Sequence, residues 1–83
     1  MLDYIYEITA WRNGSEHQYI ETPYRIKALT IAEYMTKNNP EIDSIDICKV
    51  QVGTGYMQSK RTFTLINGVW ETAYQYIGED EGR

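Results

Sequence analysis

Two Asn-Gly dipeptides, Asn13-Gly14 and Asn67-Gly68, constrain the fold of this chain more than any other feature of its sequence. Asn followed by Gly best tolerates the positive φ angles of the two-residue type I′ turn that joins antiparallel strands. Each dipeptide lies between segments rich in apolar and β-branched residues, as strands require. The sequence therefore predicts one β-hairpin near each end of the chain.

The first hairpin is predicted from residues 4–11, which alternate along their length. Tyr4, Tyr6, Ile8 and Ala10 point to one side, and Ile5, Glu7, Thr9 and Trp11 point to the other. If the loop consists of two residues only, residues 16–22 return antiparallel with a fixed register. The expected pairs are Trp11 with Glu16, Ala10 with His17, Ile8 with Tyr19, and Glu7 with Ile20.

The second hairpin comprises residues 56–66 and 69–77. The same argument predicts the pairs Ile66 with Val69, Leu65 with Trp70, Phe63 with Thr72, and Arg61 with Tyr74. The last pair allows the guanidinium to stack on the ring.

A single helix is predicted over residues 23–37, starting at Thr22-Pro23. Threonine accepts a hydrogen bond from an early backbone amide, and proline is well tolerated at the first helical position. Asn38-Asn39-Pro40 ends the helix, with Asn38 expected in the left-handed conformation. The expected buried stripe is Tyr24, Ala28, Ile31, Ala32 and Met35, flanked by Leu29.

Residues 44–52 are rich in β-branched residues and precede Gly53-Thr54-Gly55, which indicates a third strand followed by a hairpin loop. Their alternation is imperfect, which indicates a bulge or a strand that is apolar on both sides. The chain is therefore predicted to be one α+β domain of ββαβββ order, an antiparallel sheet packed on one helix, over residues 1–77. Residues 78–83 are expected to form a frayed acidic tail. The pattern leaves open which hairpin the middle strand adjoins.

Composition limits the class of protein. The 83 residues include 12 acidic and 8 basic side chains, a formal charge of −4, and the isoelectric point is about 4.8. The single cysteine, Cys48, excludes an intrachain disulfide, and residues 1–4 lack the pattern of a secretory signal. No segment approaches the roughly 20 apolar residues that span a bilayer. A cytoplasmic location without membrane association is expected.

Catalysis and cofactor binding have no support in the sequence. One histidine, His17, and Cys48 cannot form a structural zinc site, and Gly53-Thr54-Gly55 lacks the lysine and the helix of a phosphate loop. The carboxylate pair Asp43 and Asp46 has no second layer to enclose it. The chain is predicted not to be an enzyme and to bind no cofactor or metal.

One helix covers only one face of a five-stranded sheet, so the other face is open to a partner or to solvent. With Tyr6, Ile8, Tyr19, Phe63, Leu65 and Trp70 under the helix, the open face is expected to include Ile77, Gln18 and Thr64. The candidate partner interface on it is Ile5, Glu7, Trp11, Glu16, Ile20, Ile66, Val69 and Glu71. Exposed aromatic and aliphatic residues among carboxylates are typical of a docking surface or a dimer interface.

The favoured function is a non-enzymatic protein-binding module, either a homodimer or an inhibitor whose carboxylates steer it to a basic site on a partner. In size, charge and lack of a catalytic motif the chain resembles small accessory proteins of bacteriophages and mobile elements, including anti-restriction and anti-CRISPR inhibitors. That resemblance implies an anti-defence role and carries over no binding residue.

Two other functions stay open. A single-stranded nucleic-acid binder would use tyrosines beside Lys60 and Arg61, but the basic residues look scattered and are outnumbered by acidic ones. A small enzyme would need an active site shared across a dimer.

Overall fold

The structure is a computed structural model that describes residues 3–78; the predicted acidic tail at residues 79–83 lies outside this part. Five strands and one helix follow one another in the order ββαβββ, and the predicted α+β class is confirmed. The elements are β1 (Tyr4–Arg12), β2 (Ser15–Thr22), α1 (Arg25–Asn38), β3 (Ser44–Gln51), β4 (Met57–Ile66) and β5 (Val69–Tyr76).

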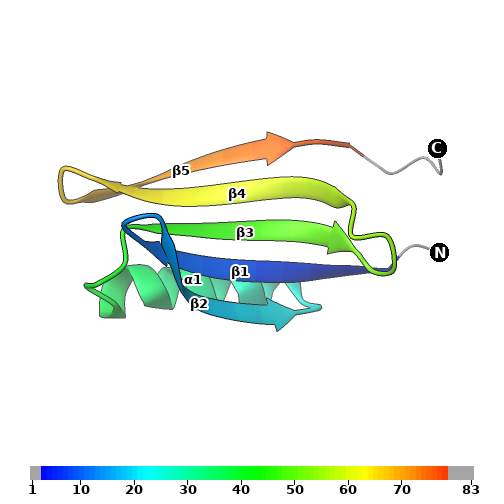
Figure 1. The fold of residues 1–83 in the computed structure, drawn as a ribbon, viewed down its shortest axis with the longest axis horizontal. Helices are drawn as coiled ribbons and strands as arrows, with labels where there is room; N and C mark the ends of the chain where they lie inside the picture. The colour runs from blue at the N-terminus through cyan, green and yellow to red at the C-terminus, as the bar shows by residue number, and fades with distance from the viewer. Residues whose placement is uncertain (1–2, 79–83) are drawn as a thin grey trace.

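The strands form one antiparallel sheet in the order β2-β1-β3-β4-β5 (Figure 1). The middle strand, β3, lies between the two hairpins and pairs with the inner strand of each. The question that the sequence left open is thus settled, since β3 adjoins both hairpins. The edge strands are β2 and β5.

The hairpin β4–β5 has the predicted register at all four pairs, including Arg61 opposite Tyr74. In the hairpin β1–β2, only the predicted pair of Trp11 with Glu16 is observed. A bulge follows, so that Ala10 pairs with Gln18, Ile8 with Ile20 and Glu7 with Glu21. The predicted pairs with His17, Tyr19 and Ile20 were wrong, because one extra residue in a strand shifts every pair beyond it.

The helix begins two residues later than predicted. The Thr22 hydroxyl accepts the Tyr24 backbone N–H at 3.2 Å, but Tyr24 itself is extended and α1 starts at Arg25. Tyr24 is 66% exposed and does not belong to the buried stripe. At the other end Asn39 has φ −118°, and Asn38 is not left-handed, so that expectation was wrong too.

The core lies between α1 and the strands β1, β2 and β3. Ala28 and Ala32 are fully buried, and their small side chains let the helix approach the sheet closely. The buried core is Ile8, Ala10, Ala28, Ala32, Met35, Ile42, Ile45 and Ile47. In Figure 1, α1 lies behind β1 and β2, while the hairpin β4–β5 extends beyond it.

Within residues 3–78, no helix is long and apolar enough to cross a membrane.

Candidate functional site

The sheet face opposite α1, called here the open face, holds seven of the eight residues of the predicted interface. Alternation and register place Ile5, Glu7, Trp11, Glu16, Ile66, Val69 and Glu71 on it. The exception is Ile20, which pairs with Ile8 and packs against the core on the helix side. Because of the bulge, Ile20 lies on the helix side and Tyr19 on the open face, the reverse of the prediction. Gln18 was expected on the open face and also lies on the helix side.

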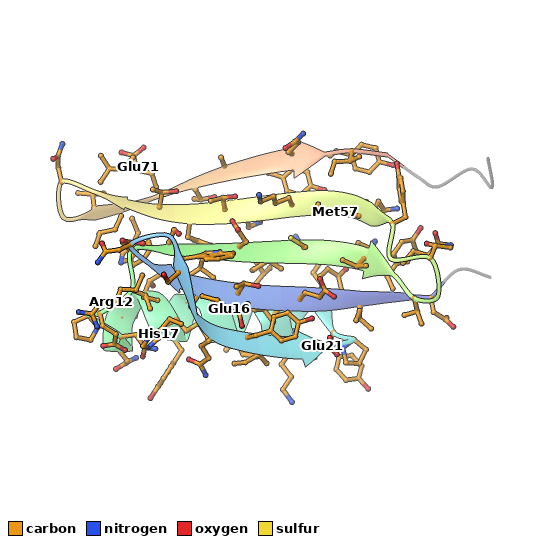
Figure 2. The ribbon with its side chains drawn as sticks, in the orientation of Figure 1. Arg12, Glu16, His17, Glu21, Met57 and Glu71 are labelled. Carbon is orange, nitrogen blue, oxygen red and sulfur yellow. The ribbon has the colours of Figure 1, made fainter. Side chains whose placement is uncertain are left out.

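Carboxylates dominate the open face. Five of them share it among the described residues: Glu7, Glu16, Glu21, Asp46 and Glu71. Lys60 is the one basic side chain on this face in the described strands, so its formal charge there is 1 − 5 = −4. Figure 2 shows Glu16 and Glu21 on β2 and Glu71 on β5, at the two edges of the sheet.

Asp46 organises the centre of the open face. Its Oδ2 accepts the Trp11 indole N–H at 3.0 Å, and its Oδ1 accepts the Thr62 hydroxyl at 3.0 Å. The Lys60 ammonium lies 3.9 Å from Oδ2. Trp11 is therefore a half-buried side chain tied to the sheet, and its indole N–H already has a partner.

Negative charge also accumulates around Tyr19. Its hydroxyl donates to Glu21 Oε2 at 2.6 Å. This hydrogen bond, with the nearby Glu7, raises the pKa of the Tyr19 phenol well above its ordinary value.

Apolar side chains occupy the two ends of the open face. Ile66 and Val69 pair beside the β4–β5 turn and are 48% and 59% exposed, respectively. Ile5 pairs with Val50 toward the opposite end, and both are half-buried. The face thus combines exposed aliphatic side chains at its ends with five carboxylates distributed over the sheet.

His17 and Cys48 cannot act as a base and nucleophile pair. His17 Nε2 lies 3.3 Å from Oε1 of Glu41, a residue of the loop that follows α1. Cys48 instead lies on the open face, between Glu7 and Lys60. Burial, with a further contribution from Asp46, raises the pKa of the Cys48 thiol. The protonated thiol, which is less nucleophilic than the thiolate, is therefore favoured. Over residues 3–78, no group of three or more His, Cys, Asp or Glu side chains is placed to hold a metal ion.

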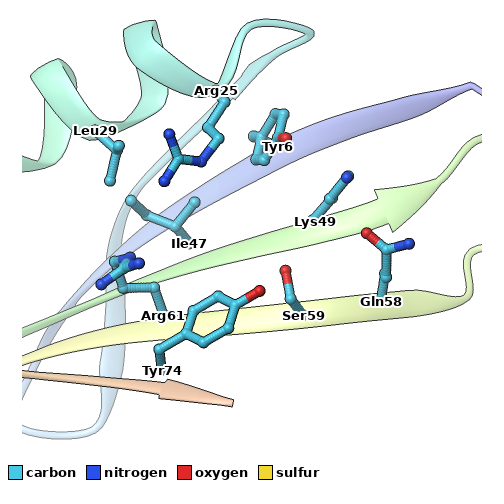
Figure 3. A pocket seen from close by; sticks show the side chains of 9 residues that line it. All are labelled: Tyr6, Arg25, Leu29, Ile47, Lys49, Gln58, Ser59, Arg61 and Tyr74. Atoms are coloured by element: carbon cyan, nitrogen blue, oxygen red, sulfur yellow. The ribbon is translucent and has the colours of Figure 1, made fainter. Parts of the chain in front are cut away.

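A second surface, the basic trough, was missed by the sequence analysis. It is a cavity of about 340 Å³ on the helix side, between α1 and the hairpin β4–β5 (Figure 3). Its lining is Tyr6 from β1, Arg25 and Leu29 from α1, Ile47 and Lys49 from β3, Gln58, Ser59 and Arg61 from β4, and Tyr74 from β5.

The expected patch of Lys60 and Arg61 does not exist as one surface. The two side chains lie on opposite faces of β4: Lys60 pairs with Cys48 on the open face, and Arg61 lines the trough with Tyr74. Arg61 lies 5.0 Å from the centre of the Tyr74 ring, as predicted from their pairing. Period-two alternation within β4 already separated these neighbours, and that signal was available in the sequence.

Comparisons of the chain with protein-family models, with curated proteins and with solved structures found no match.

Proposed function

We propose that this protein is a non-enzymatic binding module whose open face docks onto a basic protein surface. The observation that carries the proposal is that five carboxylates and a single lysine share the face opposite the helix, which gives that face a formal charge of 1 − 5 = −4. An acidic face of this kind steers a basic partner during encounter, and the exposed Ile66 and Val69 supply apolar contact once it has docked.

The proposed partner is a separate protein, because two copies meeting through this face would bring like charges together. An inhibitor that blocks a basic site on a host protein, as in the anti-defence proteins of phages and mobile elements, fits this arrangement. The function needs no active site, cofactor or metal.

The test is a titration with a synthetic peptide of alternating lysine and leucine, followed by the fluorescence of Trp11 in a Trp70→Phe background. Glu71→Lys and Glu33→Lys change the net charge equally, but Glu71 is on the open face and Glu33 is exposed on α1. We expect Glu71→Lys to weaken binding about 3- to 10-fold at low salt, and Glu33→Lys to change it less than about twofold.

Equal losses in the two variants would show that only net charge matters and would overturn the proposal. Light scattering over a concentration series tests self-association directly. A wild-type dimer that Val69→Ser dissociates would assign the face to a second copy of the chain, contrary to the proposal.

A further inference from the structure

The basic trough is chemically the opposite of the open face. Three of its lining residues, Arg25, Lys49 and Arg61, are cations, and none is acidic. They come from three successive elements of the chain, α1, β3 and β4. A chain with an overall excess of acidic residues therefore has a concave site with a local charge of about +3.

Two of the three cations of the trough lie over aromatic rings. Arg61 lies over Tyr74, and Lys49 lies 4.7 Å from the centre of the Tyr4 ring. Both ion pairs found among residues 3–78 lie elsewhere, at His17 with Glu41 and at Lys60 with Asp46. A ring fixes a cation in place without neutralising it, so the charges stay available to an anionic ligand.

The rest of the lining suits a ligand that is partly flat and partly apolar. The Tyr74 side chain is 56% exposed, which leaves much of its surface open to contact, and Leu29 and Ile47 give the trough an apolar part. The Ser59 hydroxyl adds a hydrogen-bonding group beside the cations. A volume of about 340 Å³ is within the usual range of small-ligand sites, which starts at about 300 Å³.

We propose that the basic trough binds a nucleotide unit of single-stranded nucleic acid, with phosphate on Arg25, Lys49 and Arg61 and the base against Tyr74. Tyr76 favours a polymer over a free nucleotide, because it is 58% exposed and lies on the same side of β5 as Tyr74. Successive residues on one side of a strand are about 7 Å apart, so the aromatic row continues beyond the trough.

Neighbouring residues of β4 supply a matched pair of variants. Arg61→Gln removes one charge from the trough, and Lys60→Gln removes one charge from the opposite face. The probes are a fluorescent oligo-dT of twelve nucleotides, thymidine monophosphate as the free nucleotide, and a phosphotyrosine peptide as competitor. Anisotropy titrations at several salt concentrations give the affinity and its salt dependence.

We expect the oligonucleotide to bind at low salt and Arg61→Gln to weaken it about 5-fold or more. The slope of log affinity against log salt should become shallower by about 0.7, the loss of one phosphate contact to a single strand. Lys60→Gln should leave both quantities nearly unchanged. Tyr74→Leu should weaken binding at least about 5-fold, the range for loss of one stacked base, while the exposed Tyr24→Leu should not.

Several outcomes would overturn the proposal: no binding of oligo-dT at low salt, equal effects of Arg61→Gln and Lys60→Gln, or stronger binding of the phosphotyrosine peptide. Thymidine monophosphate binding as tightly as the oligonucleotide would contradict the preference for a polymer and assign the trough to a free nucleotide. Thermal unfolding of each variant verifies that a loss of binding does not reflect a loss of fold.

Discussion

At the scale of single residues, Asp46 is the side chain on which most of the open face depends. It accepts hydrogen bonds from Trp11 and Thr62 with different oxygens and lies near Lys60, and its side chain is only 19% exposed. A carboxylate in such a position contributes more than a surface ion pair, because charged acceptors form the stronger hydrogen bonds and the site is partly screened from water.

Asp46→Asn should lower the free energy of unfolding by about 1 to 2 kcal/mol, because a charged acceptor is replaced by a neutral amide whose NH2 group can only donate hydrogen bonds. For a domain of this size each kcal/mol lowers the melting temperature by about 4 to 8 °C. Thermal and urea unfolding measure the change. Glu71→Gln, which removes an exposed carboxylate of the same face, should stay within about 0.5 kcal/mol of the wild type. An Asp46→Asn variant as stable as that control would contradict the role given to Asp46.

The reactivity of Cys48 tests the same surroundings by a different measurement. Burial and Asp46 raise the pKa of the thiol, and Lys60 lowers it. A raised pKa means less thiolate at any given pH, so the alkylation rate should rise with pH later than for a free cysteine peptide.

Iodoacetamide labelling followed by mass spectrometry over pH 7 to 10 gives these rates for Cys48. Asp46→Asn should shift the profile to lower pH, because an anion near the thiolate is removed. Lys60→Gln should shift it to higher pH, because a favourable cation is removed. Shifts in the same direction for both variants would show that the neighbouring charges do not control the thiol.

At the scale of elements, the helix is held by small side chains. The stripe of α1 that faces the sheet has Ala28 and Ala32 at 0% exposure and Met35 at 3%. The distance between helix and sheet is therefore set by two methyl groups, and a larger side chain at either position requires the layers to separate.

Ala32→Leu should destabilise the fold by about 1 to 3 kcal/mol, because the added atoms enter a filled core. Urea unfolding monitored by far-UV circular dichroism measures the effect. Thr30→Leu, on the exposed side of the same helix, is the control and should change stability by no more than about 0.5 kcal/mol. Equal stability of Ala32→Leu and the wild type would mean that a cavity lies under the helix.

Local turn chemistry explains why the element order could be predicted. Asn13 and Asn67 have φ of 51° and 52°, and the glycines that follow have φ of 81° and 80°, as the type I′ assignment requires. The register of the first hairpin was missed because a bulge beyond Trp11 leaves no mark in the alternation of Glu16, His17 and Gln18, which are all polar. The helix start was misplaced because Thr22 caps a turn that precedes the helix.

At the scale of the whole molecule, the sheet separates charges that appear mixed along the chain. Acidic residues gather on the open face, and Arg25, Lys49 and Arg61 gather in the trough on the other side. These three basic residues looked scattered in the sequence. They come together only because β3 pairs with β4 and because α1 packs on the same side of the sheet. Alternation predicts which side of its own strand a residue occupies, but it does not predict which strands are neighbours.

The same arrangement predicts a gradient of stability across the sheet. β1 and β3 are central strands covered by α1, whereas β5 is an edge strand on which seven of eight residues are exposed, and it pairs with β4 alone. Local opening of β5 breaks one strand pair and exposes little apolar surface, so it costs less free energy than opening β1, which breaks two strand pairs and exposes the core.

Native-state hydrogen exchange should therefore show the β5 amides exchanging through local opening, with protection well below that of β1 and β3. The amides of β1 and β3 should exchange only with global unfolding, and their protection should fall in parallel as urea is added. The nucleotide proposed for the trough would contact β5 through Tyr74, so oligo-dT should raise β5 protection in the wild type and not in Arg61→Gln. Uniform protection over all five strands without ligand would show that the hairpin β4–β5 opens only with the rest of the fold.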